Sequence, residues 1–415
     1  MTATETTKPS RYRWVVLAIG IAAQASTAAF FQGLASIGPA IRAQGGLTLP
    51  QLGIVLGAPT AGLVVTLLPW GAASDRYPER VVMSIGLILT SGFLLLAGSM
   101  SGLWPLSIAL GLAGSAAASV NAASGRAVLR WFGPARRGFA MGLRQTALPL
   151  GAALAAVILP SLVDGGALAP GTRALACGAL LAAIASWIWV REPPVVPSQD
   201  DHHTPTTGRR QRRAGRSGFG LLIVAGTGLV VCQSTFVSFL VEFLHGDVGL
   251  GLREAGLVFV AAQLAGAAGR VLVGVWSDRG TDRLAPLVRI SVAIGVAQFL
   301  LAALVHGPSA ALLPMAVVAG ALAICWNGLI FTAVGEMAPP GRTGTALGLQ
   351  STANYLTASL VPYAMGSLIG AAGFAVGFGV SGAAGLAVGV MLAVTRSISA
   401  GSSMLASSHV RKECQ

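Results

Sequence analysis

Long runs without a charged side chain recur along the whole chain. The longest, Thr343–Thr395, has 53 residues without Asp, Glu, Lys or Arg, and shorter runs cover Val81–Met100, Phe219–Val241 and Ala310–Gly335. A helix needs about 20 mostly apolar residues to cross a hydrocarbon layer about 30 Å thick. The runs therefore predict an integral membrane protein that crosses the bilayer many times.

Composition excludes the other classes of chain. Only 10% of the residues are charged and 54% are hydrophobic. In a soluble domain about a quarter of all residues are charged, and a disordered chain is polar. Barrel strands would alternate over about 10 residues, and no such pattern appears. The 55 glycines suit helices that pack closely. The fold class that we predict is an all-α membrane bundle.

The apolar runs predict twelve spans. The run Thr343–Thr395 is long enough for two helices with a break near residues 370–373. The first apolar run, Trp14–Ala40, is too long for the core of a cleavable signal peptide. The spans begin near Trp14, Gln51, Val81, Pro105, Gly138, Arg173, Gly218, Leu252, Pro286, Ala310, Thr343 and Gly373.

The only long polar stretch between spans lies in the middle of the chain and contains prolines, acids and an arginine cluster. We interpret it as a flexible linker between two bundles. The predicted organisation is an N-terminal tail (1–13), a six-helix bundle (14–191), the linker (192–217), a second six-helix bundle (218–395) and a C-terminal tail (396–415).

The placement of the basic residues predicts the orientation. The chain has 27 Lys and Arg and a net charge of +13. With the N-terminus in the cytoplasm, 21 of the 27 fall in cytoplasmic segments and only Arg42, Arg173 and Arg253 in external loops. This asymmetry is the positive-inside rule, so the charge indicates topology rather than nucleic-acid binding. We expect a multi-pass protein of the cell membrane with both termini in the cytoplasm.

Neither cysteines nor nucleotide motifs indicate further chemistry. The four cysteines stand singly, without disulfide or metal spacing. The chain has no phosphate-binding loop, which argues against ATP drive. We expect no cofactor and no bound metal.

The two halves of the chain repeat each other. A shift of 206 aligns Asn121–Leu143 with Asn327–Leu349 without a gap, and a shift of 203 aligns residues 71–76 with 274–279. Two matches in the same order favour a duplication. Two parallel six-helix repeats are a known transporter architecture that holds its substrate at the midplane.

The repeated segments carry a recognisable loop pattern. Gly71, Asp75 and Arg76 in the first half correspond to Gly274, Asp278 and Arg279 in the second. The pattern resembles the loop signature of the major facilitator superfamily, which implies that family's fold and a gating role for these six residues. Pro78 and Glu79 depart from it, since the family has glycine and a basic residue there. Glycine lets helices approach closely, and an acid can bond a helix N-terminus; solvated turn charges are the plainer alternative.

Three arginines fall inside predicted helices, where a charge is a candidate functional group. Arg270 lies eight residues before Asp278 and Arg144 seven after Arg137, which places them about 12 Å and 10 Å deep. No acid occurs at a comparable depth in the sequence, so a cavity containing them should prefer an anion. The alternatives are that they bond neutral groups such as Asn121, Gln145 or Asn354, and that Arg126 extends to the interface.

The eighth predicted span, which begins near Leu252, resembles a smaller group of transporters. The run Gly269–Asp278 is similar to helix 8 of the oxalate–formate exchanger and monocarboxylate transporter groups, which implies that Arg270 binds a substrate carboxylate. Helix 11 lacks the lysine that the oxalate group uses, which argues against oxalate itself.

Other polar and aromatic residues complete the candidate site. In the superfamily that this chain resembles, helices 1, 4, 7 and 10 generally line the cavity; hydrogen bonding between helices is the alternative for each residue. The candidates beside Arg270 and Arg144 are Gln24, Thr27, Phe31, Asn121, Gln233, Gln263, Trp326, Asn327, Gln350, Asn354 and Tyr355.

The sequence therefore predicts a secondary active transporter of a small, carboxylate-like anion, working by alternating access. A proton-coupled exporter of drugs or metabolites is the alternative within transport, although the deep acid expected in its first helix is absent. A membrane-embedded enzyme or a non-transporting receptor is more distant. Expected partners are the anion, protons, and membrane lipids, with no nucleic acid, and the chain is expected to be a monomer.

Overall fold

The computed structural model describes residues 11–132, 134–163, 166–192, 211–279, 284–338 and 343–413, without the side chains at 129, 134–139, 211–218, 278, 343–344 and 398–413. All regular structure in these ranges is helical. The elements are α1 (Tyr12–Phe31), η1 (Gly33–Ile37), α2 (Gly38–Gly45), α3 (Leu49–Arg76), α4 (Glu79–Ala97), α5 (Leu103–Trp131), α6 (Pro134–Gln145), α7 (Ala147–Leu162), α8 (Ala169–Trp189), α9 (Gln211–Gly246), α10 (Leu252–Asp278), α11 (Leu284–Ala303), α12 (Ser309–Cys325), α13 (Asn327–Met337), α14 (Thr343–Ala372) and α15 (Phe374–Glu413).

The twelve predicted spans are confirmed. In the described ranges, twelve helical segments are long and apolar enough to cross a membrane, and each begins within four residues of its predicted start. The expected break near residues 370–373 falls between α14 and α15. Gly373 adopts a φ of +84° there, a left-handed conformation that glycine accepts without steric penalty.

Two helices extend beyond the predicted spans. α9 begins at Gln211, inside the stretch interpreted as a linker, and α15 continues to Glu413, inside the stretch interpreted as a tail. Adding a residue to an existing helix gains a hydrogen bond without the unfavourable nucleation step. The hydropathy of a segment thus marks the end of a membrane span, but it does not mark the end of the helix.

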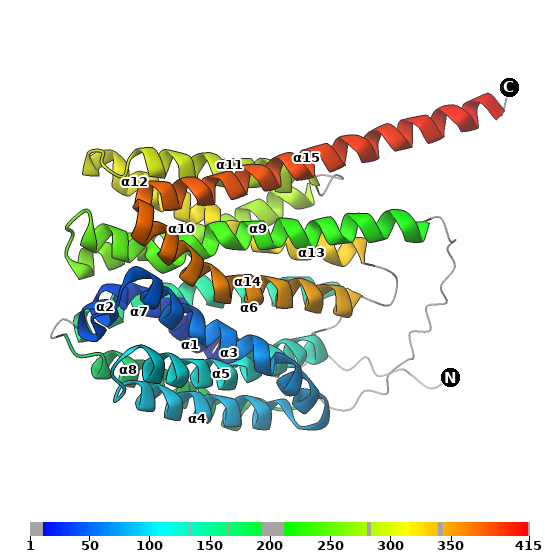
Figure 1. Ribbon diagram of the computed structural model, residues 1–415. Helices are drawn as coiled ribbons and strands as arrows, with labels where there is room; N and C mark the ends of the chain where they lie inside the picture. The colour runs from blue at the N-terminus through cyan, green and yellow to red at the C-terminus, as the bar shows by residue number, and fades with distance from the viewer. Residues whose placement is uncertain are drawn as a thin grey trace, which may run out of the picture. The chain divides into compact units, whose positions relative to one another are not determined.

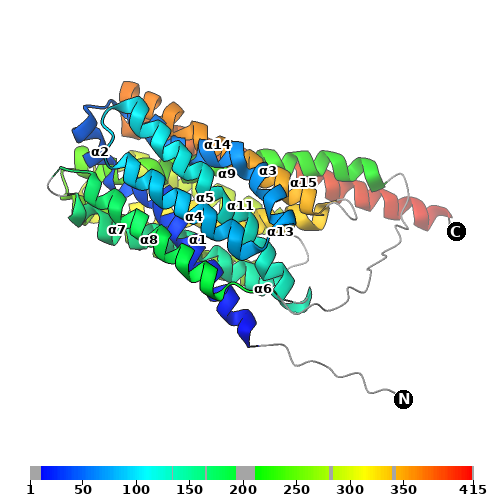
Figure 2. The same ribbon diagram turned by 90° about the horizontal axis from the view of Figure 1, so that it is seen from below.

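The chain forms two compact units. Unit 1 contains residues 11–46 and 58–192 of the described chain, and unit 2 contains residues 47–57 and the described residues from 211 onward. In unit 1, α4 packs against α5 and α8, while α1 packs against α5, α7 and α8 (Figures 1 and 2). In unit 2, α11 packs against α15, α10 against α12, and α9 against both α14 and α15.

Two membrane spans are interrupted part-way. Thr146 separates α6 from α7 in the fifth span, and Trp326 separates α12 from α13 in the tenth. At such a break, the last carbonyls of the preceding helix lose part of the regular hydrogen-bond pattern and accept other donors. Arg144 lies in the last turn of α6, and the carbonyl of Ile324 lies at the end of α12.

Glycines allow the closest contacts between α3 and α5 in unit 1. A Cβ atom added to Gly114 would lie 1.9 Å from the carbonyl oxygen of Pro59, and one added to Gly62 would lie 1.9 Å from that of Gly111. A backbone oxygen cannot move aside as a side-chain end can. The two helices therefore require glycine at these positions.

We expect Gly114→Ala to lower thermal stability, because the added methyl group must push α3 and α5 apart, and overpacking of this kind costs about 1–3 kcal/mol. Gly92→Ala is the matched control: an added Cβ there meets nothing within 4 Å, and alanine favours a helix by up to about 1 kcal/mol. The measurement is the melting midpoint of each purified variant in detergent. Equal midpoints for the two variants would contradict the packing argument.

Candidate functional site

A buried hydrogen-bond network joins three helices of unit 1. The Nε2 of Gln24 on α1 donates to the Oδ1 of Asn121 on α5 over 3.0 Å. Arg144 on α6 donates from Nη2 to the Oε1 of Gln24 over 2.6 Å and from Nε to the Oγ of Ser124 over 3.0 Å. Only 5% of Arg144 is exposed. The arginine thus ties α1, α5 and α6 together.

The position of Arg144 suits a buried cation. It lies in the last turn of α6, where the helix dipole presents its negative end, and the carbonyl of Asn121 also accepts from its Nη2 over 3.4 Å. Ser124 is the partner that sequence reasoning missed. It lies three residues after Asn121, and that spacing puts it on the same face of α5.

Arg270 in unit 2 is also bonded at a helix break. Its Nε donates to the carbonyl oxygen of Ile324 over 2.9 Å. Ile324 lies two residues before Trp326, at the C-terminal end of α12, and carries the negative end of that dipole. The same carbonyl accepts from Nδ2 of Asn327 over 3.4 Å. Arg270 and Asn327 therefore share one backbone acceptor.

A glutamine–asparagine hydrogen bond occurs in both halves. In unit 2, Nδ2 of Asn327 donates to Oε1 of Gln233 over 2.9 Å, as Gln24 bonds Asn121 in unit 1 over 3.0 Å. Asn121 and Asn327 are repeat equivalents, and each bond joins the first and the fourth span of its half. We name these two bonds the repeat pairs.

The remaining candidates in unit 2 include buried polar atoms without partners. Both amide atoms of Gln263 and the indole Nε1 of Trp326 are enclosed and make no hydrogen bond within the described residues. Gln350 donates from Nε2 to Oδ1 of Asn354 over 2.8 Å, while its own Oε1 is enclosed without a partner. Tyr355 is half-buried. Unsatisfied buried polar atoms are uncommon and fit a site that receives water or a ligand.

The other candidates of unit 1 lie along α1. Thr27 donates from Oγ1 to the carbonyl of Gln24 over 3.0 Å, and Phe31 is half-buried beside Phe30. The network of unit 1 thus contains Gln24, Thr27, Asn121 and Arg144. Phe31 lies on the same helix without a bond to that network.

The acidic loop residue Asp75 binds an arginine in this structure. Nη1 of Arg126 bonds the Oδ1 of Asp75 over 2.9 Å and the carbonyl of Ser74, and its Nε lies 3.6 Å from Glu79. Arg126 therefore has its acidic partners at the end of its span, as the alternative that it extends to the interface requires. The chain folds α3, α4 and α5 so that their ends meet, which brings together residues about 50 positions apart.

Glu79, the departure from the loop pattern, is the centre of an ionic cluster. It is 3% exposed, and Nη1 of Arg130 bonds its two oxygens over 2.9 and 3.1 Å. That hydrogen bond raises the pKa of Arg130. Glu192 extends the cluster at 3.8 Å from Arg130. An acid suits this position because two arginines of α5 face it.

The two pattern glycines do not serve close packing. A Cβ added to Gly71 or Gly274 would meet nothing within 4 Å, so the packing reason given for them is wrong. Arg76 and Arg279 are exposed at the ends of α3 and α10. The side chain of Asp278 lies outside the described residues.

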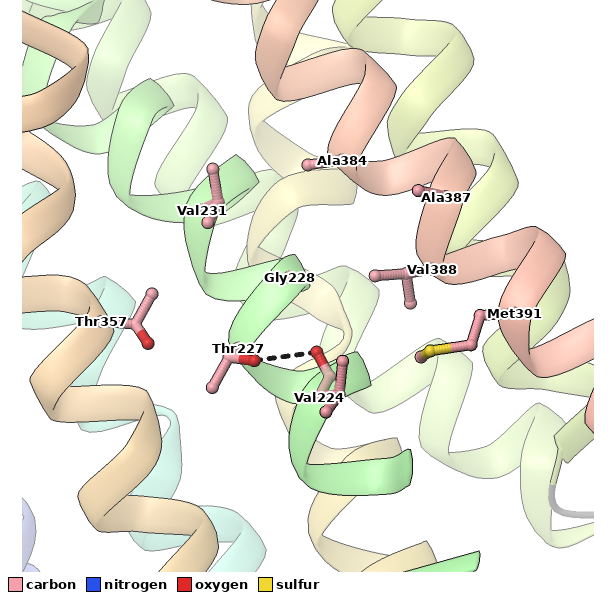
Figure 3. Close-up of a pocket in the computed structure, with 9 residues that line it drawn as sticks. All are labelled: Val224, Thr227, Gly228, Val231, Thr357, Ala384, Ala387, Val388 and Met391. Atoms are coloured by element: carbon pink, nitrogen blue, oxygen red, sulfur yellow. Dashed lines mark hydrogen bonds between the residues drawn. The ribbon is translucent and has the colours of Figure 1, made fainter. Parts of the chain in front are cut away.

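An apolar pocket of about 450 Å³ opens between α9, α14 and α15 (Figure 3). Its only polar side chains are Thr227 and Thr357, and Thr227 donates to the carbonyl of Val224 over 2.8 Å. None of the predicted binding residues lines it. The pocket therefore does not provide a charged ligand with a partner.

Comparison with known proteins decides the family. The sequence profile of the Major Facilitator Superfamily matches residues 20–362. The chain belongs to the major facilitator superfamily. It is 35% identical over 374 residues to the uncharacterized MFS-type transporter Rv2994 of Mycobacterium tuberculosis, which covers 89% of this chain and 82% of the relative.

A further relative and two solved structures agree with a transporter fold. The chain is 28% identical over 327 residues to the probable nitrate/nitrite transporter NarK2 of M. tuberculosis, covering 76% of this chain and 77% of that one. Among solved structures, a bacterial homologue of the lysosomal transporter Spinster aligns with a TM-score of 0.73 at 16% identity, over 93% of this chain and 96% of that chain. A mutant of the peptide transporter POT in complex with sulfate aligns with a TM-score of 0.75 at 13% identity, over 94% and 95%. These similarities confirm the predicted fold: the protein is a multi-pass MFS transporter and not an enzyme.

The MFS transporter should depend on Glu79 for stability. We expect Glu79→Gln to lower the free energy of unfolding by about 1.5–3 kcal/mol, because a buried acceptor of charged hydrogen bonds is weakened. Glu192→Gln is the control, since an exposed ion pair contributes about 0–1 kcal/mol. The measurement is the melting midpoint at low salt. A larger loss for Glu192→Gln than for Glu79→Gln would refute the central position of Glu79.

Proposed function

We propose that this MFS transporter moves a small oxyanion, such as an organic carboxylate, by alternating access between its two six-helix halves. Arg270 would hold the anion, and the halves 14–191 and 218–395 would rock around it. The single observation that carries the proposal is the position of Arg270 inside a membrane span, with its Nε bonded to a carbonyl at the break of the tenth span.

The bond to Ile324 orients the guanidinium. A guanidinium has five N–H donors in one plane, and the Nε–H is directed to the Ile324 carbonyl. The two Nη groups form the fork whose spacing matches the two oxygens of a carboxylate. A lysine would keep the charge but lose that fork, so the geometry favours a planar anion.

The distribution of acids in unit 2 supports the same preference. Its membrane spans contain Glu242, Glu254 and Glu336, each within four residues of a span end. Arg270 lies seven residues inside its span, about 10 Å deep. An ionised group at this depth raises the free energy of the protein. A bound anionic substrate would lower that free energy.

Buried polar atoms of the same unit supply neutral contacts. Gln263 and the indole N–H of Trp326 are enclosed without partners within the described residues, and Asn327 contacts the same carbonyl as Arg270. Donors of this kind are suited to oxyanion oxygens. The name of the relative NarK2 refers to nitrate and nitrite, which are also small oxyanions and belong in the panel of test substrates.

Arg144 has a different part in this proposal. Its donors are directed to Gln24, Ser124 and Asn121 within unit 1. We propose that it holds α6 to α1 and α5 and fixes the positions of Gln24 and Asn121. A conservative Arg144→Lys change should therefore reduce uptake less than loss of Arg270.

We expect Arg270→Gln to abolish anion uptake into proteoliposomes, because the neutral amide removes both the charge and the fork. Arg270→Lys should retain a small fraction of the rate, and Arg173→Gln, on an exposed site at the start of α8, should behave as wild type. Uptake of carboxylates, nitrate and nitrite is measured together with melting midpoints. Normal uptake by a folded Arg270→Gln variant would sink the proposal, and uptake of cationic drugs instead of anions would favour an exporter.

The orientation can be tested separately. We propose that the protein resides in the cell membrane with both termini in the cytoplasm, because of its basic loops. With Cys177 and Cys414 replaced by Ser, a cysteine placed at Thr204 should react with a membrane-impermeant thiol reagent only in inverted vesicles. Labelling in intact cells would reverse the topology.

A further inference from the structure

We call the end of unit 1 where α1 begins and α8 ends the N-terminal end. Two groups of arginines at this end differ in their partners. Arg126 and Arg130 bond the acids Asp75, Glu79 and Glu192. Three other arginines at this end, Arg13, Arg80 and Arg191, form no ion pair within the described residues and instead lie over aromatic rings.

The first aromatic cluster joins α1, α5 and the end of α8. The guanidinium of Arg191 lies 5.4 Å from the ring centre of Tyr12. Tyr12 donates from its hydroxyl to the carbonyl of Trp189 over 2.8 Å, and Nε1 of Trp131 donates to the carbonyl of Arg191 over 2.8 Å. The tyrosine and Trp131 rings lie 5.7 Å apart. Arg191 is therefore held in place without a carboxylate.

Two further arginines are held in the same manner. Arg13 lies 5.6 Å from the ring centre of Trp14 and 5.7 Å from that of Phe132, and its Nε is enclosed without a hydrogen bond. Arg80, at the start of α4, lies 5.5 Å from the ring centre of Trp187 on α8. Cation–π contacts orient an arginine but leave its charge without a counter-ion.

The exposed tryptophans place these charges at the membrane surface. Trp14, Trp187 and Trp189 are 40%, 54% and 45% exposed, and tryptophan concentrates at the membrane–water interface beside the lipid headgroups. The apolar surface continues from them along α8, where Leu181, Ile184 and Ile188 are exposed at helical spacing. The site thus has a cationic rim followed by a surface suited to an acyl chain.

We propose that the N-terminal end of unit 1 binds anionic phospholipids, with Arg13, Arg80 and Arg191 contacting headgroup phosphates and the apolar face of α8 contacting the acyl chains. Membrane lipid is the occupant that fits, because a soluble phosphate would match the arginines but not the adjacent tryptophans and exposed aliphatic side chains. Zwitterionic lipids present a positive group beside the phosphate, so they should bind less well. The acids of this end are engaged by Arg126 and Arg130, which limits their repulsion of the headgroup.

The test is native mass spectrometry of the full-length protein in detergent, titrated with phosphatidylglycerol or with phosphatidylcholine. We expect phosphatidylglycerol to be retained preferentially, and each of Arg13→Gln, Arg80→Gln and Arg191→Gln to weaken its binding about fivefold, since a surface arginine contributes about 1 kcal/mol of attraction. Arg191→Lys should retain most of the affinity. Arg173→Gln, at the opposite end of α8, is the control with the same change of charge.

Melting midpoints in the same lipids provide a second readout that does not depend on ionisation in the mass spectrometer. Phosphatidylglycerol should raise the midpoint of the wild type more than that of a folded Arg13→Gln, Arg191→Gln double variant. Equal retention of the two lipids, or an Arg173→Gln effect as large as the others, would overturn the proposal. Stabilisation by inorganic phosphate equal to that by phosphatidylglycerol would identify a free anion as the ligand and would also overturn it.

Discussion

The positive charge of an arginine side chain inside an apolar bilayer is the constraint on which much of this structure depends. Hydrocarbon provides no hydrogen-bond acceptors, so the protein must supply them. For Arg270 it supplies the carbonyl of Ile324, where the tenth span is interrupted at Trp326. For Arg144, at the end of α6, it supplies Gln24, Ser124 and the carbonyl of Asn121 from the neighbouring helices. The helix breaks, the buried amides and the candidate site are therefore connected features. In a helix without a break at Trp326, the carbonyl of Ile324 would accept the backbone N–H four residues later and would be less available to Arg270.

An arginine at the end of a span has different partners from an arginine in its interior. At the N-terminal end of unit 1, Arg126 and Arg130 form ion pairs with Asp75 and Glu79. Charged groups at the end of a span remain close to water, so the free-energy cost of holding both charges there is low. Deeper in the unit, Arg144 is bonded to the neutral groups of Gln24 and Ser124. The same residue type thus locks a loop at the surface and joins helices in the interior. Depth in the membrane, together with the neighbouring helix ends, decides which part it takes.

Sequence alone was sufficient for the architecture. Twelve spans, their starting points and the break at Gly373 follow from hydropathy and glycine chemistry, since the bilayer imposes a length and a polarity on every span. Partners across helices were harder to predict. Glu79 lies 51 residues from Arg130, and only the packing of α4 against α5 brings them together. One acceptor for Arg270 is a backbone carbonyl, which no pattern of side chains reveals. The roles of Gly71 and Gly274 were misjudged because a glycine gives no sign of whether a neighbour is close.

The repeat pairs show that the two halves use the same kind of bond between their first and fourth spans. The asparagines Asn121 and Asn327 are equivalent at the shift of 206, whereas Gln24 and Gln233 are not, so the two glutamines reach equivalent partners from different positions. The arginines are not shared in this way. By the repeat alignment, extended along the flanking helices, Arg144 corresponds to Gln350 and Arg270 to Leu67. Each charge thus arose, or was lost from the other copy, after the halves diverged. A neutral frame in both halves, with a single buried arginine in each, gives this fold a simple way to change what it carries, one substitution at a time.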